Sequence, residues 1–549
     1  MNSPLVALSA GDTIAAGDVL VYTPADGASG TINAFVIQAS DGVSTSSEIQ
    51  VTVAPSDEDA IPQEVPLEVA DEQEVDYSST CSLVDGGVGS RDRGYAQEFE
   101  SYLGISQGSA RGSTSGCEAL QAASGETGQT PVLVYLGFVG NEEPRDPEGS
   151  ISTATRARPK SLSSRSRSRH RLSPETWLSA SSSSPLSLDP GLYRHTQLPA
   201  ASTGQADDRL DLVLVTPKGT IYKRIPHATR ASVQAAIRRL IRGTTNPVIS
   251  NSTLYLPPAQ QLYQWLISPI EAELEAQGVD NLVFILDSGL RSLPLAVLHD
   301  GEQFLIERYS LGLMPSLSLT DTRKRPIDNV QVLAMGAEKF PDNTPLPAVP
   351  VELSAITNQL WQGEAFLNKN FTLRKLQQLH ESRPFGIIHL ATHAKFQPGQ
   401  ASNSYIQFSD RKATLQELRQ VLAGSPVDLL VLSACQTALG DPEAELGFAG
   451  LAVQSGARAA LGSLWQVSDE GTLALMTGFY EQLRQAPTKT EALRQAQLAM
   501  LQGKVRVENG QLVTATERFP LPPELAELGD RNLSHPFYWS AFTIVGNPW

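Results

Sequence analysis

Two short aliphatic runs, each ending in a residue that can do chemistry, most constrain the fold of this chain. The first run covers 385–393 and ends in His393, and the second covers 427–435 and ends in Cys435. Runs this short and this apolar are typical of strands buried on both faces of a parallel sheet. Because chemistry collects beyond the carboxyl ends of such strands, we expect His393 and Cys435 to lie together at one edge of the sheet.

These residue types suggest nucleophilic catalysis by a thiol. The thiolate of Cys435 would be a strong nucleophile once a neighbour lowers the pKa of the thiol, and His393 could accept the proton. Only two other cysteines occur, Cys81 and Cys117. Three cysteines in 549 residues are too few for a disulfide scaffold, although one bridge between Cys81 and Cys117 is compatible with the sequence. A buried, inert Cys435 fits the count nearly as well.

The composition narrows the classes of function. The 549 residues carry a net charge of −17, which disfavours broad nucleic-acid binding because that binding depends on positive charge. No apolar run approaches the roughly 20 residues of a membrane-spanning helix. The start of the chain, 1–8, lacks the basic region and the apolar core of a secretion signal. We expect no nucleic-acid partner, no membrane span, no metal and no cofactor.

The N-terminal residues 1–54 predict a small antiparallel β module, with turn residues between its strands. It resembles part of one bacterial cadherin-like or immunoglobulin-like repeat, and an ordinary β-hairpin appendage is the alternative. Residues 55–75 predict an extended linker, because 56–75 hold eight acids and no basic residue. The expected strands are 17–24, 34–39 and 47–53.

Ordered structure is expected to resume in 76–141, with a helix over 95–103 and a strand over 131–139. Residues 142–206 are of low complexity, and 151–172 within them hold seven Lys or Arg and no acid. The composition predicts a disordered surface insertion. A contact with RNA or an anionic membrane is the alternative, as is folding back on the acidic body of the protein.

From Leu210 onward, strands alternate with helices, and this alternation predicts an α/β fold with a mainly parallel sheet covered on both faces. Residues 211–225 form a hairpin in this interpretation, and capping boxes at Thr414/Glu417 and Thr488/Glu491 mark two helix starts. Other expected strands are 281–287, 330–336, 459–465 and 538–545, and other helices start at 256 and cover 349–361 and 372–380.

The segment 207–549 resembles a CHAT domain of the cyanobacterial type, a branch of the caspase–separase clan of cysteine peptidases. The resemblance implies a caspase-like three-layer α/β/α sandwich, to which 76–141 would add the N-terminal edge. It is carried by Pro258–Leu266, Leu286–Pro294, Met314–Ser316, Leu346–Glu352, His389-Leu-Ala-Thr-His393, Leu432-Ser-Ala-Cys435, Glu445-Leu-Gly-Phe-Ala-Gly450, Ser463–Trp465 and His535–Trp539.

The resemblance also implies roles for individual residues. His393 matches the catalytic histidine and Cys435 the nucleophile, and backbone amides around Ala394 and at Cys435 would stabilise the oxyanion. A backbone carbonyl could orient His393. His389 would face the same way as His393 in a regular strand, unless the strand departs from regular geometry after Ala391. We interpret His389 as a structural, hydrogen-bonded histidine.

Relatives in the clan cleave after basic residues, so a carboxylate should line the specificity pocket. Asp469 stands where separase has a similar Trp-x-Val-Thr-Asp segment, and a bidentate carboxylate would favour Arg over Lys. Its alternative role is that of an acid at the N-terminus of a helix. Asp287 is a second candidate, with a turn role before Gly289 as its alternative.

The sequence therefore predicts a cysteine endopeptidase that cuts protein or peptide substrates after Arg or Lys and is activated by a protein partner or by upstream sensor repeats. Two other classes stay open: a latent interaction or sensor module, and a surface adhesin that binds through the N-terminal β module. The thiol chemistry and the missing signal favour the cytoplasm. A cell surface fits the β module if the chain is part of a longer protein.

An enzyme that prefers arginine would also find sites in its own chain. We expect the active protein to cut itself within 156–171, in cis or in trans, whereas Cys435→Ala should stay whole. Mass spectrometry of the fragments locates the cut. An intact chain after long incubation of protein that cleaves an added substrate contradicts this prediction. The candidate arginines are Arg165, Arg167, Arg169 and Arg171.

Overall fold

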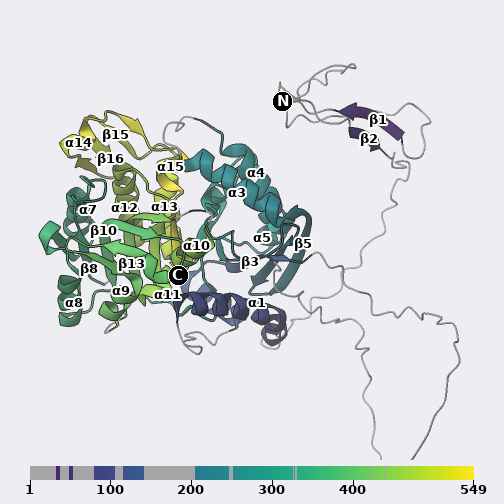
Figure 1. Ribbon diagram of the computed structural model, residues 1–549, viewed down its shortest axis with the longest axis horizontal. Coiled ribbons are helices and arrows are strands. Elements are labelled where there is room, and N and C mark those ends of the chain that lie inside the picture. Colours follow the sequence, from purple (N-terminus) through teal and green to yellow (C-terminus); the bar gives the residue numbers. More distant parts are fainter. Residues whose placement is uncertain are drawn as a thin grey trace, which may run out of the picture. The chain divides into compact units, whose positions relative to one another are not determined.

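The computed structural model divides the chain into two compact units, Met1–Val75 and Asp76–Trp549 (Figure 1). The predicted linker and nearly all of the Ser/Arg-rich insertion, including 156–171, lie outside the described residues. The residues that the structure describes are 32–37, 49–53, 80–104, 115–140, 204–245, 252–325, 327, 330–423, 426–437, 439 and 441–549.

In the first unit, β1 (Ile32–Ile37) and β2 (Ile49–Val53) form an antiparallel pair with an irregularity between Asn33 and Phe35. These strands overlap two of the three predicted ones. The third, 17–24, lies outside the described residues, so the cadherin-like repeat stays a prediction.

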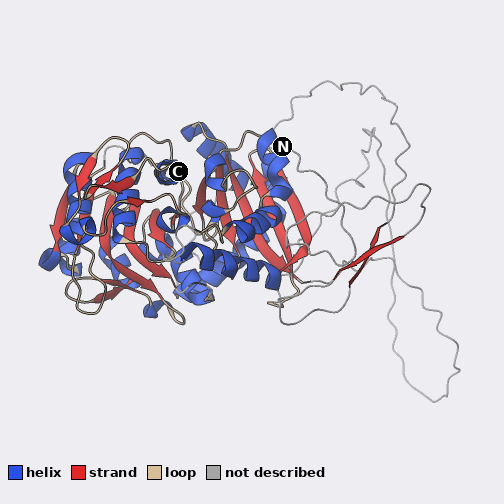
Figure 2. Cartoon of the chain, turned by 90° about the horizontal axis from the view of Figure 1, so that it is seen from above, coloured by secondary structure: helices blue, strands red, loops and turns tan. Residues whose placement is uncertain are grey.

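The described part of the second unit is built on a 13-stranded sheet, and helices lie on both sides of its strands (Figure 2). The strand order is β12-β11-β10-β13-β14-β19-β7-β6-β3-β4-β5, and β8 pairs with both β10 and β9. The strands are β3 (Pro131–Val139), β4 (Arg209–Thr216), β5 (Gly219–Thr229), β6 (Asn281–Leu286), β7 (Ser310–Leu313), β8 (Val332–Gly336), β9 (Gly363–Leu367), β10 (Ile387–Phe396), β11 (Tyr405–Gln407), β12 (Lys412–Thr414), β13 (Leu429–Thr437), β14 (Ala459–Ser463) and β19 (Phe542–Gly546).

The helices that cover the sheet are mostly short, and a separate four-stranded sheet follows α13. That small sheet contains β15 (Arg506–Glu508), β16 (Gln511–Val513), β17 (Arg518–Pro520) and β18 (Arg531–Asn532). The helices are α1 (Thr80–Leu103), α2 (Gly116–Thr127), α3 (Arg230–Thr245), α4 (Leu256–Leu266), α5 (Glu271–Ala276), α6 (Leu305–Arg308), α7 (Val349–Ala355), α8 (Leu373–Ser382), α9 (Leu415–Leu422), α10 (Pro442–Ala449), α11 (Leu451–Ser455), α12 (Asp469–Leu483), α13 (Lys489–Leu501), α14 (Pro523–Ala526) and α15 (Pro536–Trp539).

The predicted mainly parallel sheet is confirmed, and it consists of two parallel groups that run in opposite directions. Strands β9, β8, β10, β13 and β14 are parallel to one another. Strands β19, β7, β6 and β3 form the second parallel group. The groups meet at the antiparallel pair β14–β19. The carboxyl ends of the two groups therefore lie at opposite edges of the sheet.

Local sequence signals account for most element boundaries. The continuous apolar run 131–139 becomes β3 and is buried along its whole length. The capping box at Thr414 and Glu417 forms as predicted. At Thr488 only the first half forms, because the Glu491 carboxylate accepts from Arg494 instead.

One predicted strand starts too early. The expected strand 538–545 begins only at Phe542, since Pro536–Trp539 forms α15. His535 caps this helix by accepting the backbone N–H of Phe537, and Pro536 suits the first helical position. Two aromatic residues of the apolar run thus belong to a helix.

The N-terminal helices attach to the sheet through polar contacts. The Asp92 carboxylate on α1 accepts the backbone N–H groups of Leu317 and Ser318, at 2.6 and 3.0 Å. Cys117 on α2 is disulfide-bonded, while the side chain of Cys81 lies outside the described residues.

Gly336, at the end of β8, lies against the middle of β10. A Cβ at this position would approach the carbonyl oxygen of Ala391 to 2.5 Å. We expect Gly336→Ala to lower the free energy of unfolding by about 1–3 kcal/mol, because the two strands cannot separate without losing their pairing. Gly125→Ala is the matched control, since an added Cβ on this exposed α2 residue meets nothing within 4 Å. Urea denaturation of both variants tests the difference, and equal midpoints would refute it.

Candidate active site

Four parallel strands present their carboxyl ends at one edge of the sheet. They are β8, β10, β13 and β14, and each is followed by a loop or a bend at that edge. His393 and Cys435 lie near the ends of β10 and β13, and Asp469 begins α12 shortly after β14. The predicted meeting of strand ends is therefore present here.

The register brings His393 and Cys435 onto neighbouring strands at nearly the same level. In the parallel pairing of β10 with β13, His393 lies opposite Ala434, and Ala394 lies opposite Cys435. The side chain of Cys435 is outside the described residues. The backbone pairing thus places His393 and Cys435 one residue apart in register.

An extra residue in β10 separates the two histidines. Leu390 pairs with Leu432 and His393 with Ala434, so β10 uses three residues where β13 uses two. Such a bulge reverses the alternation of side chains along a strand. The departure from regular geometry that would separate His389 from His393 is therefore confirmed.

His389 is held in a buried polar network. Its Nε2 lies 2.8 Å from a carboxylate oxygen of Glu352 on α7, and its Nδ1 lies 3.2 Å from the hydroxyl of Tyr480 on α12. All three side chains are buried. Because a carboxylate only accepts, Nε2 donates to Glu352, and Nδ1 of a neutral ring then accepts from Tyr480. Both ring nitrogens of His389 are thereby satisfied.

His393 has a different set of partners, in the loop 337–348 that joins β8 to α7. Its Nε2 lies 2.7 Å from the carbonyl oxygen of Thr344. The centroids of the His393 and Phe340 rings lie 5.3 Å apart, in an edge-to-face arrangement. A carbonyl can only accept, so Nε2 carries the proton and Nδ1 of the neutral ring is free of one. Burial, helped by nearby Lys395, lowers the pKa of His393, against the opposite effect of the Thr344 bond. The neutral ring is therefore favoured.

The same loop receives Asp469. A carboxylate oxygen of Asp469 accepts the backbone N–H of Ala348 at 2.5 Å. Burial, together with the negative charges of Glu352 and Glu470, raises the pKa of Asp469 to about 7. Asp469 also lies in the first turn of α12, so its alternative role as a helix N-terminal acid is structurally present as well.

Asp287 lies elsewhere. It follows β6, which belongs to the second parallel group, so it lies at the edge opposite to that of His393. Its carboxylate accepts from Arg230 and from the backbone N–H groups of Phe138 and Ser288. The structure does not bring Asp287 to the candidate site, and its turn role before Gly289 fits these contacts.

A family model described as "CHAT domain" matches residues 256–547, which is more than half of the chain. This chain belongs to the CHAT domain family. No curated protein matches it.

Two crystal structures of the Saccharomyces cerevisiae separase–securin complex show distant similarity to the CHAT protein. Their TM-scores are 0.37 and 0.36, at 10% and 11% sequence identity. Each match covers 62% of this chain and 29% of the matched chain. The CHAT protein thus spans less than a third of the length of the chain to which it is similar.

The helix that follows Cys435 is anchored to the rest of the CHAT protein by a buried contact. Ser292, in the loop after β6, donates to the Glu445 carboxylate on α10 at 2.6 Å. At Gly447 an added Cβ would come within 3.3 Å of the Phe396 ring. This glycine therefore allows close packing of α10 on β10.

The sequence did not identify some of the residues around the two histidines and Asp469. The Thr344 carbonyl and the Ala348 amide are backbone groups, which every residue type offers, so no side-chain pattern could identify them. Glu352 and Tyr480 lie 37 and 91 residues from His389 and meet it only through packing. The sequence indicated only that His389, in a buried strand, would need a hydrogen-bond partner from elsewhere in the chain.

The described residues offer neither a metal-binding cluster nor a membrane-spanning helix. They contain no group of three His, Cys, Asp or Glu side chains placed to hold a metal ion. Within the same residues, no helix combines the length and the apolarity that crossing a bilayer requires.

The raised pKa of Asp469 predicts a pH-dependent stability. The folded-state pKa of Asp469, about 7, exceeds the ordinary value of about 3.9. The Asp469 carboxyl group therefore stabilises the fold fully below about pH 4, and this stabilisation is lost as the pH rises through 7. Asn stays neutral and can still accept the Ala348 N–H. We therefore expect the melting temperature of Asp469→Asn, relative to wild type, to increase between pH 4 and pH 8. Asp410→Asn controls for loss of an exposed charge; the same trend there would contradict the assignment.

Proposed function

We propose that this CHAT protein is a cysteine endopeptidase that uses His393 as the base and Cys435 as the nucleophile, in a caspase-like arrangement. The observation that carries the proposal is the pairing of β10 with β13, which puts Ala394 opposite Cys435. The Thr344 carbonyl supplies the second support, because it holds His393 in the tautomer that leaves Nδ1 ready to accept a proton.

The proposed reaction begins with transfer of the Cys435 thiol proton to Nδ1 of His393. The thiolate adds to the scissile carbonyl carbon, and the tetrahedral intermediate collapses to a thioester when His393 returns the proton to the leaving amine. Water then adds to the thioester carbonyl carbon as His393 takes its proton, the C–S bond breaks to release the acid product, and His393 returns the proton to the Cys435 thiolate. The Thr344 carbonyl stabilises the imidazolium that forms between these steps.

The oxyanion would be stabilised by backbone N–H groups near the two strand ends. Ala394 and Cys435 face each other in the register, so amides around Ala394 and at Cys435 are the candidates. Donors placed before the reaction are effective because they need no reorganisation when charge develops on the oxygen.

A carboxylate at Asp469 would select a basic side chain in the substrate. Two further acids lie close, since Glu352 and Glu470 both raise the pKa of Asp469. Glu470 already pairs with Arg531, at 3.2 Å. A substrate guanidinium would stabilise the ionised Asp469 and would favour Arg over Lys through bidentate bonding.

Substitution of the two central residues tests the activity. We expect Cys435→Ala and His393→Ala to lower kcat/KM for an Arg-ended fluorogenic peptide by at least about a thousandfold, because each removes a reacting group. His227→Ala, an exposed histidine on β5, should retain wild-type kinetics. The lowered pKa of His393 predicts that kcat/KM reaches its plateau below the pH at which an ordinary histidine loses its proton.

Three outcomes would each contradict a different part of this proposal. Turnover that survives Cys435→Ala would remove the assignment of the nucleophile. No turnover and no labelling of Cys435 by an Arg-type chloromethyl ketone would favour the latent interaction module. Equal cleavage of Arg and Gln substrates would remove Asp469 from the specificity pocket and leave the catalytic pair intact.

A further inference from the structure

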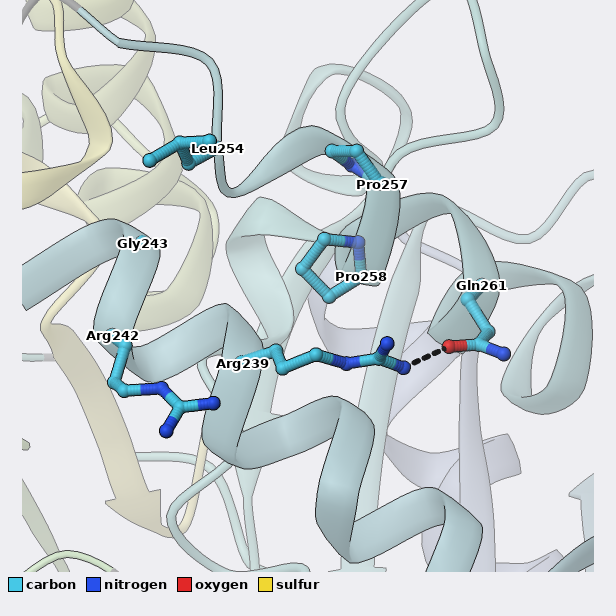
Figure 3. A pocket seen from close by; sticks show the side chains of 7 residues that line it. All are labelled: Arg239, Arg242, Gly243, Leu254, Pro257, Pro258 and Gln261. Atoms are coloured by element: carbon cyan, nitrogen blue, oxygen red, sulfur yellow. Dashed lines mark hydrogen bonds between the residues drawn. The ribbon is translucent and has the colours of Figure 1, made fainter. Parts of the chain in front are cut away.

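A cavity of about 560 Å³ lies between α3 and α4, and none of its lining residues belongs to the candidate active site (Figure 3). This volume falls within the range typical of ligand-binding pockets. Arg239 and Arg242 enter it from α3, and Figure 3 shows proline and glutamine side chains entering from the other helix. Its lining residues are Arg239, Arg242, Gly243, Leu254, Pro257, Pro258 and Gln261.

The two helices that line this cavity are together basic, although the protein is strongly acidic. The stretch 230–270, which contains both helices, holds four arginines and no acid, whereas the whole chain carries a net charge of −17. Arg239 donates one hydrogen bond to Gln261, at 2.7 Å. In the described part of the chain, the side chain of Arg242 makes no hydrogen bond or ion pair, and its backbone belongs to α3.

The acids nearest in sequence are already occupied. On α5, Glu271 and Glu275 pair with Arg308, and Glu273 pairs with Lys223. They therefore do not neutralise the two guanidinium groups of the cavity. A guanidinium offers five N–H donors, so Arg239 and Arg242 retain donors for an incoming carboxylate.

An apolar wall lies beside this charge. Leu254 is 64% exposed, which is unusual for a large aliphatic side chain, and Pro257 and Pro258 open α4 next to it. Exposed apolar side chains beside arginines are typical of protein-binding surfaces. An occupant must therefore carry negative charge and an apolar group close together.

The cavity is also preformed. A Cβ at Gly243 would approach the backbone nitrogen of Tyr255 to 2.8 Å, so α3 and the start of α4 are in close contact here. The bond between Arg239 and Gln261 ties the helices together on the other side. A preformed site loses little conformational entropy on binding.

We propose that this cavity docks an acidic segment of a partner protein, with Asp or Glu carboxylates on Arg239 and Arg242 and an apolar side chain on Leu254, Pro257 and Pro258. The docking does not require peptidase activity. The charge of the arginines and the exposed Leu254 together favour a peptide of mixed acidic and apolar composition over a simple anion.

Fluorescence anisotropy of a labelled peptide of alternating Glu and Leu tests the proposal on the full chain. We expect saturable binding that weakens as salt increases, because salt screens exposed charges. Arg239→Gln combined with Arg242→Gln should weaken binding by at least about tenfold. Arg238→Gln, an exposed arginine of the same helix that does not line the cavity, should bind as wild type does.

Three results would overturn the proposal. A peptide with Gln in place of Glu that binds equally well would remove the role of charge. Unchanged binding by the double variant, with melting temperatures equal to wild type, would place the peptide elsewhere. Displacement of the peptide by inorganic phosphate at an equal concentration would identify a small-anion site instead of a docking surface.

Discussion

Between Leu390 and His393, strand β10 carries one residue more than its partner β13, and the candidate active site depends on this bulge. Before the bulge, His389 extends into a buried network. After it, His393 meets the 337–348 loop and lies almost level with Cys435. A regular strand would give both histidines the same orientation. The extra residue lets one strand serve the core and the site at once, and the tight packing of Gly336 on Ala391 holds the bulge from the other side.

The 337–348 loop links the candidate base to the candidate specificity acid. Thr344 accepts from His393, and four residues later Ala348 donates to Asp469. Below the loop, Glu352 on α7 binds His389 and is one of the charges that raise the pKa of Asp469. Burial of these groups makes each hydrogen bond costly to lose, since an unpaired buried polar group is penalised by about 1–3 kcal/mol. The C-terminal half of the loop is therefore positioned by polar contacts with β10 and α12.

The opposite directions of the two parallel groups place the candidate residues at different edges of the sheet. The first group gathers His393, Cys435 and Asp469 at one edge, and the second group carries Asp287 at the other. The basic cavity between α3 and α4 belongs to helices that connect β5 to β6, outside the first group. The lining of the cavity shares no residue with the candidate site.

The sequence by itself determined the elements whose signals are local. The run 131–139 predicted β3 to the residue, because a strand buried on both faces must be continuously apolar. Thr414 and Glu417 predicted a helix start, since a capping box needs only four residues. Motifs around His393 and Cys435 indicated the CHAT family. Only the tertiary structure decided the direction of the second strand group, which moved Asp287 away from the site, and the choice of the Thr344 carbonyl as the partner of His393. Strand direction depends on pairings between distant segments, and a carbonyl is present in every residue, so neither leaves a pattern in the sequence.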